Sequence, residues 1–346
     1  MEEAKEMIRA TRKAIGKNDP SEDWKIVPTE HAEMYEDTAP PLAEVLRGAR
    51  PGGLAKMYED LNDRAVKARN NFKSTVVRAD AAVFSTASLA ALLLIAGGLQ
   101  ELLAGAGPWV VKIIGILGVV SVGLATMWLN QVSGGDLIKK WINERAKAEG
   151  KRLTYFKAIM DGVSDEPSDQ LLAFEYTRRF LLDNQIDYFR ERGIEHGDAA
   201  DIALKTSTRA VFLASTFTAV AGFLAWLEPQ LAVIAGLGVI ASAYATLAVS
   251  RSLVNLDRKN ADRYRTAEDQ LKERKLDIDT FREKIASGEK GAVKKFFEPI
   301  FVTLVADHKE FLAGAELNES AIGNMEERLR AARKPFDSDQ SQDSGK

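Results

Sequence analysis

Residues 81–99 read AAVFSTASLAALLLIAGGL and contain no charged side chain. Asp80 closes this stretch on one side, and Gln100 and Glu101 close it on the other. The hydrocarbon core of a bilayer is about 30 Å thick, and a helix of roughly 20 apolar residues crosses it. The stretch therefore predicts a transmembrane helix.

Three later stretches have the same character, which gives expected spans at about 81–99, 111–130, 210–227 and 231–250. Only Glu228, Pro229 and Gln230 separate the last two. The alternative is a set of buried helices in a soluble core, but charged residues make up 28% of the chain and leave little else to cover four such helices. We therefore expect an all-α membrane protein with two two-helix transmembrane hairpins and long cytoplasmic helical extensions that form a bundle.

Basic residues near the ends of the spans predict their orientation, because cytoplasmic flanks carry an excess of Lys and Arg. Such residues surround the inner ends of both expected hairpins: Arg64, Lys67, Arg69, Lys73, Arg78, Lys139, Lys140, Arg145, Lys205, Arg209, Arg251, Arg258 and Lys259. The outer loops hold only Lys112. Both hairpins are expected to point outwards, with both chain ends in the cytoplasm.

The two hairpins resemble each other in sequence. Residues 117–126, LGVVSVGLAT, align without a gap on residues 237–246, LGVIASAYAT. The tripeptide AVF also begins the first span of each pair, at residues 82–84 and 210–212. Together with the matching orientation, this favours an internal duplication.

Charged stretches with apolar residues at helical spacing surround both hairpins and predict long amphipathic helices. One is expected to run from Gly53 into the membrane, another to begin near Ser168 as an N-cap, and a third to leave the membrane through residues 255–285. Pro299 suits the first turn of a helix and fits its middle poorly. The expected segments are an N-terminal helix and linker (1–53), two hairpin units (54–163 and 164–287), C-terminal amphipathic helices (288–333) and a disordered tail (334–346).

The apolar side chains of the C-terminal helix need a partner surface. A helical bundle, within one chain or between copies in a homo-oligomer, is the first interpretation, with Phe297, Phe301 and Leu304 as a candidate oligomer seam. The second interpretation places this helix on the lipid surface. Acidic residues on the same helix, among them Glu298 and Asp307, disfavour contact with anionic lipid.

Composition argues against several function classes. The net charge is −3, which gives no sign of nucleic-acid binding, and the absence of cysteine removes thiolate chemistry and zinc–cysteine sites. The three histidines lie in unrelated segments without metal-ligand spacing, and no phosphate-binding loop is evident. We therefore expect no cofactor and no enzymatic activity. The spans carry no ionisable residue at mid-depth, which disfavours an ion-coupled transporter.

The spans do carry small and hydroxyl side chains, and these are candidates for helix packing or for a pore lining: Ser121, Thr126, Gly238, Ser242 and Thr246. Gly238, Ser242, Thr246 and Ser250 recur every four residues and so share one helix face. Small residues allow helix backbones to approach closely in a membrane. The same hydroxyls could line a water-filled path in an assembled protein. The sequence leaves both interpretations open.

Several short motifs stand in the segments that flank the second expected hairpin: DNQIDY at 183–188, Tyr264, Arg265, Glu268 and Leu271, and then Phe301, Val302 and HKEFL at 308–312. In these residues the chain resembles the SLATT family, the SMODS and SLOG-associating two-transmembrane effectors. The motifs cover the second half of the chain, whereas a tandem pair of hairpins departs from the family's single hairpin.

The resemblance implies a membrane effector of the bacterial inner (cell) membrane, acting in a nucleotide-signalled defence system. It also implies a nucleotide-sensing or nucleotide-synthesising partner protein. The expected function is thus a pore-forming or membrane-perturbing effector that acts as a homo-oligomer in the lipid bilayer. The alternative is a non-conducting membrane scaffold that anchors a cytoplasmic helical platform.

Overall fold

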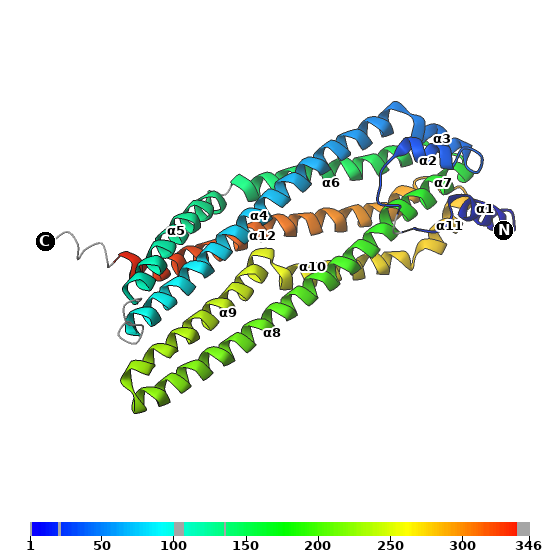
Figure 1. The fold of residues 1–346 in the computed structure, drawn as a ribbon. Coiled ribbons are helices and arrows are strands. Elements are labelled where there is room, and N and C mark those ends of the chain that lie inside the picture. Colours follow the sequence, from blue (N-terminus) through cyan, green and yellow to red (C-terminus); the bar gives the residue numbers. More distant parts are fainter. Residues whose placement is uncertain (1, 20–21, 100–106, 135, 338–346) are drawn as a thin grey trace. The chain divides into compact units, whose positions relative to one another are not determined.

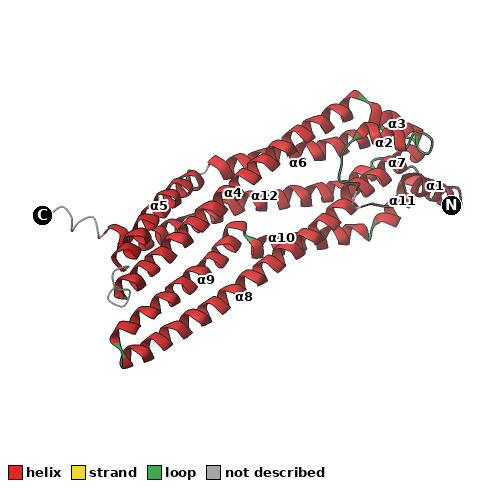
Figure 2. Ribbon diagram, viewed as in Figure 1, coloured by secondary structure: helices red, strands yellow, loops and turns green. Residues whose placement is uncertain are grey.

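The computed structural model describes residues 2–19, 22–99, 107–134 and 136–337. Within these ranges every regular element is a helix (Figures 1 and 2). In chain order they are α1 (Glu2–Ile15), α2 (Pro28–Met34), α3 (Pro40–Arg47), α4 (Ala49–Gly98), α5 (Gly107–Ser133), α6 (Asp136–Gly162), α7 (Pro167–Thr177), the π-helical turn η2 (Arg178–Asp183), α8 (Asn184–Leu227), the 3₁₀ turn η3 (Pro229–Ile234), α9 (Ala235–Asn255), α10 (Asp257–Lys275), α11 (Ile278–Ala286) and α12 (Ala292–Asp337).

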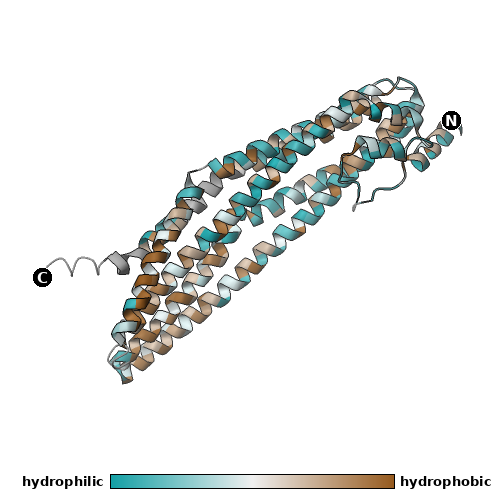
Figure 3. Cartoon of the chain, turned by 45° about the horizontal axis from the view of Figure 1, so that its top comes forward, coloured by the Kyte–Doolittle hydropathy of each residue, from teal (hydrophilic) through white to brown (hydrophobic). Residues whose placement is uncertain are grey.

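Within the described residues, four helical stretches are long and apolar enough to cross a membrane: Ala49–Gly98, Gly107–Gly162, Pro167–Leu227 and Pro229–Lys275. Hydrophobic residues are concentrated in one part of each stretch (Figure 3). Many of these side chains are exposed, among them Ile116, Phe212 and Trp226. Exposed apolar side chains in such numbers are typical of a surface that contacts lipid or another chain rather than water.

The chain divides into two units, and neither is continuous in sequence. Unit 1 consists of residues 1–68, 140–195 and 259–313. Unit 2 consists of residues 69–139, 196–258 and 314–346. The apolar parts of the four long stretches all belong to unit 2.

Unit 1 has a large core of aliphatic and aromatic side chains. Helix α1 packs against α7 and α11, and α3 packs against α7. The fully buried members of this core include Tyr35, Tyr155, Phe156, Phe174, Tyr176, Phe189 and Phe297.

The segment after α1 was expected to be a linker, but the helices α2 and α3 lie within it. Tyr35, Leu42 and Leu46 are buried there, and this burial stabilises a segment whose prolines and acidic residues suggest a loop.

His31 lies inside this core. Its Nδ1 is 2.7 Å from the hydroxyl of Tyr176, and its ring packs on Phe180 at a centroid distance of 4.3 Å. The Tyr176 hydroxyl also hydrogen-bonds the Tyr155 hydroxyl at 2.8 Å. Burial lowers the pKa of His31 to about 4, while nearby Asp23 raises it and Arg179 lowers it further. The ring is therefore neutral at neutral pH.

We expect unit 1 to lose stability between pH 7 and pH 4 because of His31. The unfolded chain binds a proton near pH 6.5, whereas the folded chain does not until about pH 4, so acid favours unfolding across this window. The loss should reach about 3 kcal/mol at pH 4. Unfolding measured against pH for the wild type and for His31→Gln tests this, since the variant should have a flatter profile. Parallel profiles would contradict it.

Several helix boundaries differ from those expected. Helix α4 already begins at Ala49, with Pro51 in its first turn, where no intrahelical donor is needed. Helix α7 begins at Pro167, so Ser168 lies inside it and does not cap it. Helix α12 runs unbroken from Ala292 to Asp337, through Pro299, whereas more than one helix was expected across residues 288–333. The buried side chains on either side of Pro299, such as Phe297 and Ile300, offset the lost hydrogen bond.

The C-terminal tail was expected to be disordered from residue 334. Helix α12 instead continues to Asp337, and the remainder of the tail, residues 338–346, lies outside the described residues. The loop expected after the first span also falls largely outside them, at residues 100–106.

Helices α4 and α9 pack against each other in unit 2 and run in opposite directions. Phe84 meets Tyr244 edge to face, with ring centroids 6.1 Å apart. Further along, a Cβ placed at Gly236 would lie 2.6 Å from Cγ1 of Ile95, and one placed at Gly98 would overlap Val233. Glycine therefore allows this close approach. The end of α4 and the start of α9 lie together at one end of unit 2.

Candidate functional site

Ser121 lies in the contact between α4 and α5. Its hydroxyl is 3.0 Å from the hydroxyl of Thr86 and donates to the carbonyl oxygen of Ala82 at 3.2 Å. Ser121 and Thr86 are both buried. In an apolar surrounding, these hydrogen bonds hold two helices together. The structure therefore places Ser121 in helix packing.

Gly238 lies in the contact between α8 and α9. A Cβ built on it would be 3.0 Å from the carbonyl oxygen of Ala214 and 3.0 Å from the hydroxyl of Thr218. A side chain at this position would crowd both atoms, so Gly238 also serves packing. It therefore differs in role from Ser242 and Thr246, with which it shares a helix face.

Ser242 and Thr246 line a groove of about 380 Å³ in unit 2. Its walls come from α4, α9 and the last turns of α12: Asp80, Val83, Phe84, Ala87, Ala90, Ala91, Leu94, Val239, Ser242, Ala243, Thr246, Leu247, Arg328 and Ala331. Thr126, which the sequence repeat equates with Thr246, is not among these residues. Its hydroxyl donates to the carbonyl oxygen of Val122 in its own helix at 2.9 Å. The two threonines thus have different surroundings.

One end of this groove is charged. Nε of Arg251 is 3.2 Å from a carboxylate oxygen of Asp80, whose side chain is buried. Arg328 comes from α12, far along the chain, and points a guanidinium nitrogen at the carbonyl oxygen of Thr246, 3.5 Å away. Met325 and Leu329 on the same helix are buried in unit 2. The groove therefore joins an apolar wall to one guanidinium group and one carboxylate, and the guanidinium group of Arg251 pairs this carboxylate from beside the groove.

The candidate oligomer seam lies elsewhere and needs a correction. Phe297, Phe301 and Leu304 are buried in the core of unit 1 within a single chain. Phe297 contacts the ring of Phe174 at a centroid distance of 5.5 Å. Because the same chain already fills this apolar surface, these three side chains have no face left for a second copy. The helical spacing of these side chains identifies an apolar face, but spacing alone cannot show whether the same chain or a second copy covers that face.

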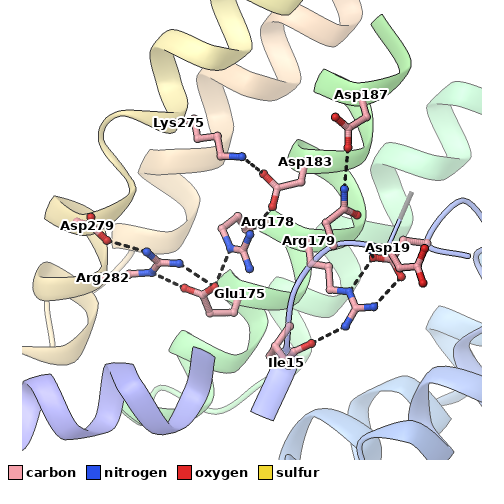
Figure 4. Close-up of polar contacts among 12 residues, drawn as sticks. Ile15, Asp19, Glu175, Arg178, Arg179, Asp183, Asp187, Lys275, Asp279 and Arg282 are labelled. Atoms are coloured by element: carbon pink, nitrogen blue, oxygen red, sulfur yellow. Dashed lines mark hydrogen bonds and ion pairs between the residues drawn. The ribbon is translucent and has the colours of Figure 1, made fainter. Parts of the chain in front are cut away.

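Unit 1 also contains a buried ionic network that spacing alone did not reveal (Figure 4). Glu175 is almost fully buried and accepts hydrogen bonds from Arg282 at 2.5 and 3.0 Å and from Arg178 at 2.7 Å. Arg178 also contacts Asp183, which pairs with Lys275 at 2.7 Å. The network joins α7, η2, α10 and α11.

The adjacent Arg179 makes a separate set of contacts. It donates to the carbonyl oxygen of Ile15 at 2.6 Å (Figure 4). It also holds both carboxylate oxygens of Asp23, at 2.7 and 2.8 Å. Both arginines stand at the start of the π-helical turn η2. Such turns are rare and often occur at functional sites. Here the turn lets neighbouring arginines join two different sets of acidic partners.

The residues that carry the family resemblance converge in unit 1. The side chain of Asn184 donates to the carbonyl oxygen of Asp23, and Asp187 accepts a hydrogen bond from Asn18 at 2.8 Å. Tyr264 packs edge to face on Tyr188 at 5.9 Å. These side chains connect α8 to α10 and to the segment after α1, which is a structural role.

Across the described parts of the chain, no group of three or more His, Cys, Asp or Glu side chains is arranged to hold a metal ion. Of the five candidate residues in the spans, Ser121 and Gly238 lie in helix contacts, Ser242 and Thr246 line the groove, and Thr126 lies outside it. Comparisons of the chain with protein-family models, with curated proteins and with solved structures find no match.

Proposed function

We propose that this chain is a multi-pass protein of the bacterial inner membrane in which α4, α5, α8 and α9 cross the bilayer as two hairpins, with both chain ends in the cytoplasm. Several copies assemble and open a conducting path. The observation that carries this proposal is the groove in unit 2, where Ser242, Thr246, Asp80 and Arg328 interrupt an otherwise apolar surface. Ionisable groups beside transmembrane helices are costly and typically serve function.

Two features support assembly and orientation. Large apolar side chains are exposed on the helices of unit 2, including Phe212 at 70% and Trp226 at 80%, and they offer surface to lipid or to further copies. The end of α4 and the start of α9 lie at the same end of unit 2, as two hairpins pointing the same way require. The excess of basic residues at the opposite end favours the cytoplasm for that side.

The resemblance to SLATT effectors supports a role in a nucleotide-signalled defence system. In that role a nucleotide-sensing or nucleotide-synthesising partner supplies the trigger. Unit 1, with its large aromatic core and buried ionic network, is then the part that receives it. The path itself uses no cofactor and no catalytic step.

Overproduction of the wild-type chain in a bacterium is expected to depolarise the inner membrane, and Ser242→Leu with Thr246→Leu is expected to abolish the effect. Both changes remove hydroxyls that can satisfy water along the groove and replace them with apolar groups. A voltage-sensitive dye measures the depolarisation in cells, and planar-bilayer recordings measure the current through the purified protein. Thr126→Leu is the matched control, because Thr126 lies outside the groove, and it should leave conduction intact.

Membrane insertion and oligomeric state must stay unchanged in the double variant. If Thr126→Leu and the double variant reduce conduction equally, the path does not follow the groove. If the wild-type chain never depolarises cells and passes no current in bilayers, the chain is a non-conducting scaffold whose hairpins anchor unit 1.

A further inference from the structure

Two guanidinium groups and one carboxylate lie at or beside the charged end of the unit 2 groove. Arg328 and Asp80 line this end, and Arg251, which is not a lining residue, pairs the Asp80 carboxylate at 3.2 Å. The hydrogen bond from Arg328 to the Thr246 carbonyl oxygen is long, at 3.5 Å. A guanidinium group has five N–H donors, so Arg328 retains capacity for an anion.

The rest of the groove is apolar and elongated. Its wall on α4 extends from Asp80 to Leu94, about 21 Å of helix at 1.5 Å per residue. One leaflet of the hydrocarbon core is about 15 Å deep, half of the bilayer's 30 Å. Leu94 and Val239 are exposed at 61% and 49%, so the groove is open along its side. Small residues such as Ala87, Ala90 and Ala91 form its floor.

We propose that this groove binds one anionic phospholipid of the cytoplasmic leaflet. The headgroup phosphate contacts Arg328 and Arg251, and one acyl chain lies along α4 and α9. Charge complementarity selects the anionic headgroup, since basic pockets between transmembrane helices on the cytoplasmic side bind such headgroups. The volume of about 380 Å³ falls at the small end of ligand pockets, which suits a single chain rather than a whole lipid.

The proposal rests on the part of the proposed function that places α4 and α9 across the membrane. It does not require conduction, and because an acyl chain lying along α4 and α9 fills the groove, the groove conducts only when no lipid occupies it. A chain that passes no current but retains the lipid would be a scaffold with a lipid site, whereas a conducting chain without lipid preference would lack the site.

The test is native mass spectrometry of the full-length protein in detergent micelles, incubated with equal amounts of phosphatidylglycerol and phosphatidylcholine. Phosphatidylglycerol should remain bound in preference, and Arg328→Gln should lower its retention about fivefold, the effect of removing one basic contact near the membrane surface. Arg330→Gln is the matched control, because Arg330 is exposed on the same helix and does not line the groove. It should leave retention unchanged.

Two further measurements separate headgroup from chain. Ser242→Phe adds a bulky ring at an exposed position of the groove wall. The ring should block the acyl chain and reduce retention of phosphatidylglycerol, although both arginines remain. Glycerol 3-phosphate, which has the anionic group without acyl chains, should compete weakly. Equal retention of the two lipids, or equal effects of Arg328→Gln and Arg330→Gln, would overturn the proposal. Strong competition by glycerol 3-phosphate would show an anion site without a lipid groove.

Discussion

Replacing Glu175 by Ala is expected to lower the free energy of unfolding of unit 1 by about 3–5 kcal/mol, because breaking a buried ion network leaves buried charge incompletely compensated. Glu175 is 1% exposed, and without it Arg178 keeps only Asp183 and Arg282 keeps only the exposed Asp279 as acidic partners (Figure 4). Hydrogen exchange of peptides from α7 and α11 in the detergent-solubilised protein reports this loss locally.

Asp279→Ala provides the matched control. Asp279 also pairs with Arg282, at 2.7 Å, but its side chain is 85% exposed. Exposed ion pairs contribute about 0–1 kcal/mol, so this variant should stay close to the wild type. If the Glu175 and Asp279 variants protect the peptides of α7 and α11 equally from hydrogen exchange, the buried network does not stabilise unit 1.

Phe297→Ala is expected to destabilise unit 1 by about 3–5 kcal/mol, the usual cost of deleting a buried aromatic ring. Phe297 is fully buried and contacts Phe174, Phe296 and Phe301. Urea unfolding of the full-length protein measures the change. The expected loss is in folding and not in subunit association, because these contacts lie within one chain.

Val302→Ala, on the same helix, is the control for this variant. Val302 is 63% exposed, so the change should stay within about 0.5 kcal/mol. If Phe297→Ala instead leaves unfolding unchanged and dissociates an oligomer, the ring belongs to a subunit interface, as its spacing alone suggested.

The apolar stretches and the amphipathic helices could be predicted from sequence, because the period of the pattern and its length determine both. The stripe of Phe297, Phe301 and Leu304 was recognised on the same basis. What covers it could not be predicted, since periodicity identifies an apolar face and says nothing of its partner. The helices α2 and α3 were missed for a related reason: distant aromatic residues stabilise them, and their local composition favours a loop.

Only some of the residues that line the groove could be predicted from the sequence. Ser242 and Thr246 were found by their spacing on one helix. Arg328 lies more than eighty residues further along, in a charged helix that resembles any solvated one. It lies on α12, which is one continuous helix where separate helices were expected across residues 288–333. The spacing of apolar residues on that helix gave no sign that Arg328 approaches Thr246.

The division of the chain into discontinuous units also constrains how the protein is made. The core of unit 1 combines residues near the N-terminus, such as Ile15 and Tyr35, with Phe297 and Leu304 near the end of the chain. A ribosome synthesises all four apolar stretches before it reaches α12. The core of unit 1 therefore closes only after all four apolar stretches have been synthesised, and no single uninterrupted fragment of the gene encodes either unit alone.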